Sequence, residues 1–246
     1  MRELTYCFLF QTTSENVTRR IALRPLGTPF AVSSSRLDTK AISTRFLKSP
    51  LMQTEQYSTS QSARDVDTCV RKCPNESEVL RRIKPLLEKL VRSPGSVPAE
   101  AFAPRKDRFA MNLIHMPRDE RFSMVGGVWH PGQTTPIHDH LTWALIGVYD
   151  GEEMEALFRR TNDGSNPKIA KIEKVSEKIN TKGHVTVLGN RGIHRVDNIS
   201  GKPTTSIHVY GRDIGHAERH SYDPVTGEIS RFVSGYCNVL RDKERF

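Results

Sequence analysis

From about residue 110 onward, the sequence is a succession of short apolar segments separated by turn-forming residues. Gly, Pro, Asn and Asp punctuate the segments, as at Pro131-Gly132 and Asp150-Gly151. Short segments of this kind are typical of strands, and many of them at close intervals favour a sandwich or barrel. We therefore expect a mainly β fold, with strands over residues 122–129, 142–149, 153–159, 169–175, 184–188, 195–198, 204–210 and 232–239.

Several other architectures are excluded by the same reading. The chain has 246 residues, of which 36% are hydrophobic, and no apolar run approaches the roughly 18 residues that a membrane helix needs. There is no alternation of strands and helices, no G-x-G-x-x-G motif and no G-x-x-x-x-G-K motif. Dinucleotide-binding and P-loop folds are therefore not expected, and we expect no membrane partner.

A helical pattern precedes the β region. Asn75 can cap a helix, Glu78 follows three residues later, and Pro85 either kinks the helix or begins a second one. A proline- and glycine-containing stretch at 93–98 ends the pattern. We expect a helix over 75–92 that packs on a core through apolar residues at helical spacing, namely Val79, Leu80, Ile83, Leu87 and Leu90.

The first 63 residues differ in composition from the rest. They are rich in Ser, Thr and Arg and poor in acidic residues, and residues 1–54 alone hold 8 Lys and Arg against 3 Asp and Glu. This composition is typical of an organelle transit peptide, although a plain disordered tail would look similar. We expect residues 1–63 to be disordered and 64–246 to form the folded domain, in a cytoplasmic or mitochondrial protein.

The distribution of charge and cysteine restricts the binding partners that we expect for the protein. The net charge is +9, but most of the excess lies in the first segment, and the body shows no basic stripe with interleaved aromatic residues. We therefore expect no nucleic-acid partner. Cys69 and Cys73 are not followed by a second pair, so a zinc knuckle is not expected, and four dispersed cysteines indicate free thiols.

Nine histidines all lie at or after residue 115, within the β region. Imidazole is a common ligand for iron, copper and zinc. His138 and His140 form the sharpest pair, because residues i and i+2 of a strand point to the same face and can reach one ion. The other histidines, including His216 and His220, are expected to lie outside a metal site.

The surroundings of this pair resemble the first motif of the cupin superfamily, which runs G-x5-H-x-H-x3,4-E-x6-G. Gly132, His138, His140 and Gly151 match it, whereas Ala144 stands at the glutamate position. The resemblance implies a double-stranded β-helix, or jelly-roll barrel, preceded here by short helices.

A second cupin motif, G-x5-P-x-G-x2-H-x3-N, is matched in part further along the chain. Gly183, His194 and Asn198 occupy its positions, while Gly189 and Arg191 replace its proline and its second glycine. The resemblance implies that His194 is the third metal ligand, beside the histidine pair.

The absence of a ligand glutamate at Ala144 has a chemical consequence. Three neutral imidazoles leave the full charge on a divalent ion and leave coordination positions free. This arrangement suits an anionic substrate and dioxygen on Fe(II), much as the two-histidine-one-carboxylate triad leaves room for both.

A third feature is the alternation in Ser206, His208 and Tyr210, which are separated by apolar residues. On a strand the three polar side chains share one face and can form a hydrogen-bond chain that orients substrate or moves a proton. Taken alone, the same pattern also fits an ordinary exposed strand face.

With the metal motif, this alternation makes residues 75–240 similar to the thiol dioxygenases of the cysteine dioxygenase type. The resemblance implies Fe(II) held by His138, His140 and His194, and oxidation of a small thiol to its sulfinate by O2. It implies that Ser206, His208 and Tyr210 are the catalytic triad of that family.

The resemblance also implies a substrate-binding arginine just beyond the triad. Arg219 is the favoured candidate, and Arg212 is the alternative. No cysteine lies between residues 74 and 236, so the metal strand cannot carry the cysteine that animal members link to their tyrosine. This favours the branch that oxidises 3-mercaptopropionate, with cysteine as the other substrate considered.

Two other functions remain open at this point. One is a different metal-dependent cupin enzyme, such as an isomerase or an oxygenase of a non-thiol substrate. The other is a cupin that binds a ligand without catalysis. For the thiol dioxygenase, the expected partners are the thiol and O2 alone, with the protein a monomer.

Overall fold

The computed structural model describes residues 56–239, which form a mainly β domain with two helices in front. The mainly β fold expected from the sequence is confirmed. The elements are α1 (Thr59–Lys72), α2 (Glu76–Val91), a 3-10 turn (Ala99–Phe102), β1 (Ala110–His115), β2 (Ser123–Trp129), β3 (Ile137–Asp139), β4 (Ala144–Asp150), β5 (Glu152–Arg160), β6 (Ile172–Thr181), β7 (Val185–Leu188), β8 (Ile193–Asp197), β9 (Thr204–Tyr210), β10 (Arg219–Tyr222) and β11 (Ile229–Phe232).

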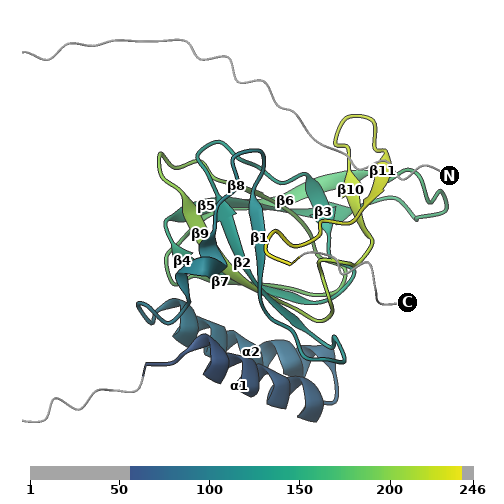
Figure 1. The fold of residues 1–246 in the computed structure, drawn as a ribbon. Helices are drawn as coiled ribbons and strands as arrows, with labels where there is room; N and C mark the ends of the chain where they lie inside the picture. The colour runs from purple at the N-terminus through teal and green to yellow at the C-terminus, as the bar shows by residue number, and fades with distance from the viewer. Residues whose placement is uncertain (1–55, 240–246) are drawn as a thin grey trace, which may run out of the picture. The chain divides into compact units, whose positions relative to one another are not determined.

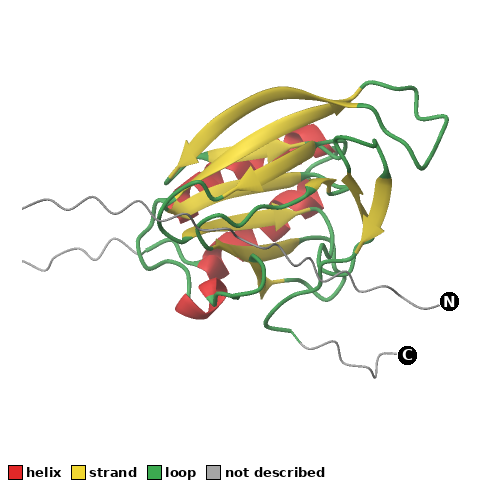
Figure 2. Ribbon diagram, turned by 90° about the horizontal axis from the view of Figure 1, so that it is seen from above, coloured by secondary structure: helices red, strands yellow, loops and turns green. Residues whose placement is uncertain are grey.

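The strands form two antiparallel sheets that face each other (Figure 1). One sheet has the order β1-β2-β9-β4-β7, and the other has the order β11-β10-β3-β8-β5-β6. Because several neighbours in each sheet are distant in sequence, such as β2 and β9 or β3 and β8, the chain passes repeatedly between the two layers, as a jelly roll requires. Figure 2 shows both helices on one side of the strands.

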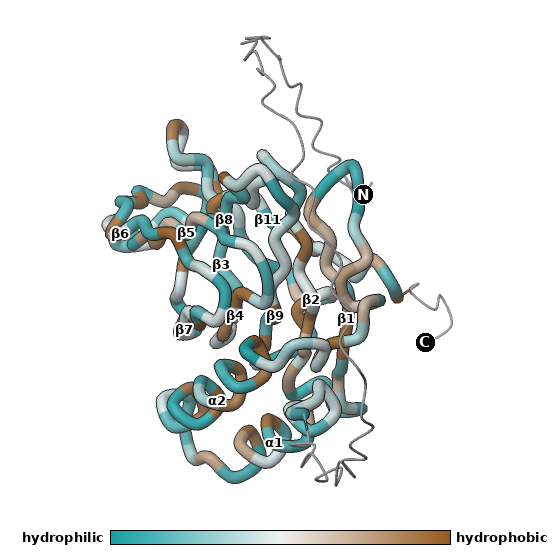
Figure 3. Tube along the Cα trace, turned by 90° about the vertical axis from the view of Figure 1, so that its left-hand side faces the viewer, coloured by the Kyte–Doolittle hydropathy of each residue, from teal (hydrophilic) through white to brown (hydrophobic). Residues whose placement is uncertain are grey.

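Helix α2 covers the outer face of the five-stranded sheet. Its buried residues Ile83, Leu87 and Leu90 join a core cluster with residues of β2, β4 and β9. The helix approaches the sheet closely at Gly147 of β4, which has no side chain. A Cβ atom at this position would lie only 2.7 Å from Val91 Cγ1. The apolar positions of α2 are visible in Figure 3. Within the described part of the chain, neither helix has the length and hydropathy to cross a membrane.

The predicted helix over 75–92 is α2, and its Asn75 cap accepts a hydrogen bond from the Glu78 amide. The expected disordered segment 1–63 differs from the structure at its end, because α1 begins at Thr59. Ser58 caps α1 by accepting from the Gln61 amide, and Ala63 is buried against the core. Serine at this position is thus a helix cap rather than part of a tail. The rest of that segment, residues 1–55, lies outside the described residues.

The strand predictions are correct for most of the barrel but fail at its margins. The strand expected over 232–239 is wrong, because β11 ends at Phe232. The strand expected over 169–175 begins three residues later and runs to Thr181, since the long partner β5 continues to pair with it. Four short strands, β1, β3, β10 and β11, were not predicted.

Residues 233–238 form a strap, hereafter the C-terminal strap, that runs beside β1. The Cys237 amide donates to the Met111 carbonyl, and the Gly235 amide donates to the Gly215 carbonyl. The side chain of Asn238 accepts from the amide of Leu113 and donates to its carbonyl. These contacts imitate a strand ladder without regular pairing, and they fix the strap against the barrel.

Candidate metal centre

The pairing of β3 with β8 places the two halves of the histidine set side by side. In the register of these strands His138 lies directly opposite His194, and His140 follows the last residue of β3. Ligand atoms of the three histidines all lie within 4.8 Å of one another. All three side chains are buried. The structure therefore brings together the three residues that the sequence nominated as metal ligands.

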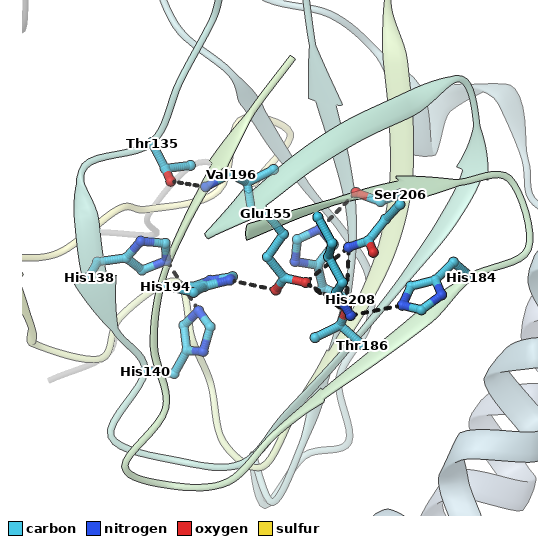
Figure 4. A network of polar contacts seen from close by, with 12 residues as sticks. Thr135, His138, His140, Glu155, His184, Thr186, His194, Val196, Ser206 and His208 are labelled. Carbon is cyan, nitrogen blue, oxygen red and sulfur yellow. Dashed lines mark hydrogen bonds and ion pairs between the residues drawn. The ribbon is translucent and has the colours of Figure 1, made fainter. Parts of the chain in front are cut away.

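The hydrogen bonds of two rings determine which nitrogen faces the centre. His138 Nδ1 donates to the Pro136 carbonyl at 2.9 Å, and His194 Nδ1 donates to Glu155 Oε1 at 3.0 Å. Each ring must then present the lone pair of Nε2. The Nε2 atoms of His138 and His140 lie 3.2 Å apart. Figure 4 shows the three imidazoles gathered at one place in the barrel.

The electrostatics of the centre suit a cation ligand set. Burial, and then repulsion from His194, hold the pKa values of His138 and His140 well below the ordinary value of 6.5. Neutral imidazoles that converge through their lone pairs are the donor set that divalent iron, zinc or copper accepts. The residues therefore fit a bound metal ion. Iron, zinc and copper are all compatible with these donors.

Ala144, at the glutamate position of the first motif, is fully buried in the apolar part of the barrel. It lies between Leu188 of β7 and Tyr210 of β9 in the register of the five-stranded sheet. Among the described residues, the candidate ligand group contains the three histidines without a carboxylate. The expectation of an all-histidine centre agrees with this geometry.

A buried carboxylate adjoins the centre, although the sequence analysis did not single it out. Glu155 of β5 accepts hydrogen bonds from His194, from Asn180 Nδ2 at 2.9 Å and from Thr186 Oγ1 at 2.6 Å. Burial raises its pKa, but the hydrogen bonds from these three neighbours outweigh burial and lower the pKa to about 2. Glu155 is thus an anion inside the barrel, and Figure 4 shows it on the far side of His194.

The residues of the proposed triad form a continuous chain on β9. Ser206 Oγ lies 2.8 Å from His208 Nε2, and His208 Nδ1 lies 2.7 Å from the Tyr210 hydroxyl. All three face the barrel interior, so the alternative of an exposed strand face is wrong. The Tyr210 ring packs edge-on against His140 at a centroid distance of 5.0 Å. The chain therefore ends at the metal centre.

Burial keeps both ionisable members of this chain neutral. It lowers the pKa of His208 to about 3, and it raises the pKa of Tyr210 above its ordinary value of 10.0, although Arg219 opposes that rise. A neutral imidazole between two hydroxyls can accept a proton from one side and donate on the other. The Tyr210 hydroxyl is therefore a proton donor or acceptor beside the centre.

Arg219 of β10 lines the same cavity as His138 and His194. Its side chain is buried, with a residue exposure of 3%, and its guanidinium stacks over the Phe232 ring at 4.6 Å. It makes one hydrogen bond within the described residues, to Ser234 Oγ at 2.7 Å, and no salt bridge there. Arg212, the alternative, is exposed and does not line the cavity. A buried guanidinium without an anionic partner among the described residues can bind an anion.

The cavity around the centre is lined by only a few kinds of side chain. Aromatic and apolar side chains make up most of its lining, including Phe109, Trp129 and Phe232, together with His138, His194, His208, Tyr210 and Arg219. Among the described residues that line the cavity, Arg219 is the one with a permanent charge, and none has a carboxylate. Trp129, which the sequence analysis passed over, stacks on His208 at 5.6 Å and shapes one wall.

His216 and His220 lie outside the candidate metal centre, as expected, and contact other residues. His220 donates to Asp139 through both its amide and its ring, and the Tyr222 hydroxyl donates to the same carboxylate. Asp139 lies between His138 and His140, so these contacts attach β10 to the strand that carries the pair. His216 contacts Asp213 instead of the centre.

A barrel of two antiparallel sheets with three converging histidines inside has the architecture of a cupin with a candidate metal site. Residues 106–223 match the family model for cysteine dioxygenase type I. This stretch includes β1 to β10 and with them the histidine centre, the Ser206–Tyr210 chain and Arg219. Over these residues, somewhat less than half of its length, the chain is similar to the cysteine dioxygenase type I family.

Solved structures of other cupins also resemble the chain. A Klebsiella pneumoniae protein described as an uncharacterized conserved protein with a double-stranded β-helix domain is 16% identical, with 46% of this chain and 85% of that chain covered and a TM-score of 0.35. A rmlc-like cupin protein from Desulfovibrio desulfuricans is 22% identical, with 46% of this chain and 92% of that chain covered and a TM-score of 0.33.

Proposed function

We propose that the protein is a non-haem Fe(II) thiol dioxygenase that oxidises a small thiol carboxylate to its sulfinate with O2. One observation carries the proposal. Arg219, a buried guanidinium without an anionic partner among the described residues, shares a cavity with His138 and His194 of the three-histidine centre. The family match supports it, because the matched stretch contains all of these residues.

His138, His140 and His194 would hold the iron through Nε2. Iron supplies binding of the thiolate and activation of dioxygen, which is chemistry that protein side chains lack. The protein contributes position and charge. Arg219 would bind the carboxylate of the substrate through paired hydrogen bonds, which suit the planar anion. This second attachment fixes the sulfur relative to the histidines.

In this proposal Tyr210 would act on the reacting atoms. Its hydroxyl is hydrogen-bonded to His208, which in turn contacts Ser206. The chain holds the hydroxyl in one orientation beside His140 and can supply or take up a proton there. The aromatic lining excludes water, which strengthens each of these electrostatic contacts.

The cavity lining favours 3-mercaptopropionate over cysteine and cysteamine. All three have a thiol, but cysteine and cysteamine also have an ammonium group. The lining offers a cation for a carboxylate and no carboxylate for an ammonium, so an amine would be buried without a partner. Cysteamine would in addition leave Arg219 without an anion.

The geometry also bears on the two alternative functions. A metal-dependent cupin of another reaction class would account for the histidines. It gives no specific reason for a buried Arg219 that has no anionic partner among the described residues. A cupin that binds a ligand without catalysis would not need the Ser206–Tyr210 chain to end at the metal centre.

The test is oxygen consumption by protein that has been loaded with Fe(II) under anaerobic conditions. Parallel reactions contain 3-mercaptopropionate, cysteine or cysteamine, and His140→Ala is the control. We expect uptake with formation of the sulfinate, fastest with 3-mercaptopropionate and lost in the variant. Iron binding without thiol-dependent uptake would contradict the proposed substrate class, and failure to bind iron would favour the ligand-binding alternative.

A further inference from the structure

In the described barrel, Glu155 is the one negatively charged side chain that contacts a candidate metal ligand, His194. We propose that Glu155 is a positioning residue for His194, and that its buried charge replaces the ligand carboxylate that Ala144 cannot provide. This inference rests on the metal site of the proposed function and deepens it. It concerns how the chain builds affinity for the ion, rather than which thiol it oxidises.

The surroundings of Glu155 indicate a carboxylate held for its charge. Three donors converge on its two oxygens, from His194, Asn180 and Thr186. They come from β8, β6 and β7, so parts of both sheets cooperate to place one group. The side chain is 1% exposed, and it is therefore not an ordinary surface acid. A buried anion is tolerated only when its lone pairs are satisfied in this way.

The contact with His194 has two physical effects. It keeps the proton on Nδ1, which leaves the Nε2 lone pair free toward the centre. It also fixes the ring plane, and the adjacent negative charge makes the imidazole a stronger donor to a cation. His138 receives the first effect from the Pro136 carbonyl, but a carbonyl has no net charge. Glu155 therefore adds a charge that the other ligands lack.

Glu153 provides a matched control on the same strand. It lies two residues before Glu155, so its side chain shares the inner face of β5, and it is also 1% exposed. Neither of its carboxylate oxygens has a hydrogen-bond partner among the described residues. A general effect of removing a buried acid from β5 should appear at both positions, whereas an effect through His194 should appear at Glu155 alone.

The experiment measures Fe(II) affinity under anaerobic conditions by competition with a chromophoric chelator, and Co(II) affinity by its visible absorption. Glu155→Gln retains a group that accepts from His194 but removes the charge, and Glu155→Ala removes both. We expect roughly a 10–100-fold loss of affinity for Glu155→Gln, with a larger loss for Glu155→Ala, since partners behind metal ligands contribute on this scale. Glu153→Gln should stay within about twofold of the wild type, because it contacts no ligand.

A second pair of variants covers the case in which the Glu155 variants fail to fold, as judged by circular dichroism. Thr186→Val removes the 2.6 Å hydrogen bond to Glu155 at a distance from the ion. It should weaken metal binding by a few-fold, and Thr186→Ser, which retains the hydroxyl, should restore it. The Co(II) spectrum should shift with the Thr186→Val variant and return with Thr186→Ser.

The outcomes separate this inference from the proposed function. Equal metal affinities in the wild type and the Glu155 variants, or equal losses at Glu153 and Glu155, would overturn the inference. If the affinities follow the expected order but no thiol is oxidised, the proposed reaction fails and the inference stands. If the wild type binds neither ion, both are overturned.

Discussion

Arg219 donates a 2.7 Å hydrogen bond to the hydroxyl of Ser234, which lies on the C-terminal strap. The strap is fixed to β1 through the side chain of Asn238. Within the described residues, the single hydrogen bond that the buried guanidinium donates is therefore accepted by a segment outside the regular strands. This links the position of Arg219 to the attachment of the strap.

Removal of this contact should weaken substrate binding more than turnover. Ser234→Ala leaves the stacking of Arg219 on Phe232 but removes its hydrogen bond. We expect KM for 3-mercaptopropionate to rise by about 2–10-fold with kcat little changed, because one such bond contributes about 0.5–1.5 kcal/mol. Steady-state oxygen uptake checks this. The exposed Ser230 provides the control Ser230→Ala, and equal effects of the two changes would contradict the account.

Arginine replacement separates the two carboxylate-binding candidates. Arg219→Ala should raise KM for 3-mercaptopropionate by roughly 10–100-fold, as expected when a charge-assisted hydrogen bond is lost. KM for cysteamine, which has no carboxylate, should change little. Arg212→Ala should behave as the wild type, because Arg212 is exposed outside the cavity. Loss of 3-mercaptopropionate binding in the Arg212 variant alone would reverse the assignment.

Tyr210→Phe tests the hydrogen-bond chain. The change removes the hydroxyl that contacts His208 but retains the ring against His140. We expect kcat to fall by about 10²-fold, the lower end for a positioned proton donor, with Fe(II) affinity unchanged. Tyr149→Phe, on the helix side of the barrel, should have no effect on kcat. Wild-type turnover by the Tyr210 variant would show that its hydroxyl has no part in the reaction.

The buried carboxyl group of Glu153 should make the stability of the metal-free protein depend on pH. Burial, and then repulsion from Glu155, raise its pKa from 4.5 to about 8. The folded state therefore holds a proton that the unfolded chain releases, so the free energy of unfolding should fall as the pH rises from 4.5 toward 8. Glu153→Gln removes this loss, and its stability advantage should grow over that interval, to on the order of 3 kcal/mol at pH 7.

Urea denaturation of the metal-free wild type and the Glu153→Gln variant, at several pH values over this interval, measures that difference. A stability difference that stays constant with pH would show that the Glu153 carboxyl does not titrate abnormally in the folded state.

The parts of the site that follow strand periodicity were predictable from the sequence. His138 and His140 share a face because they are two residues apart, and the same period places Ser206, His208 and Tyr210 together. His194 could be predicted as a ligand only from the spacing of the second motif. Ser206, His208 and Tyr210 lie on β9, whose local pattern is strong.

Glu155 could not be found in this way, because its contact with His194 spans 39 residues and depends on the register of β5 with β8. Local pattern carries no information on that register. The signal in the sequence was weak but present, since Glu153 and Glu155 place two carboxylates on one face of a predicted strand. Similarly, β3 has three residues and is stabilised by its neighbours β8 and β10 rather than by propensity.

The origin of the product oxygens tests the central claim most directly. Iron-loaded protein is supplied with 3-mercaptopropionate under isotopically labelled dioxygen in ordinary water, and the product is analysed by mass spectrometry. The account predicts a sulfinate in which both oxygen atoms carry the label, and no product from the His140→Ala variant. A sulfinate with oxygen from water, or no sulfinate from a protein that holds iron, would contradict it.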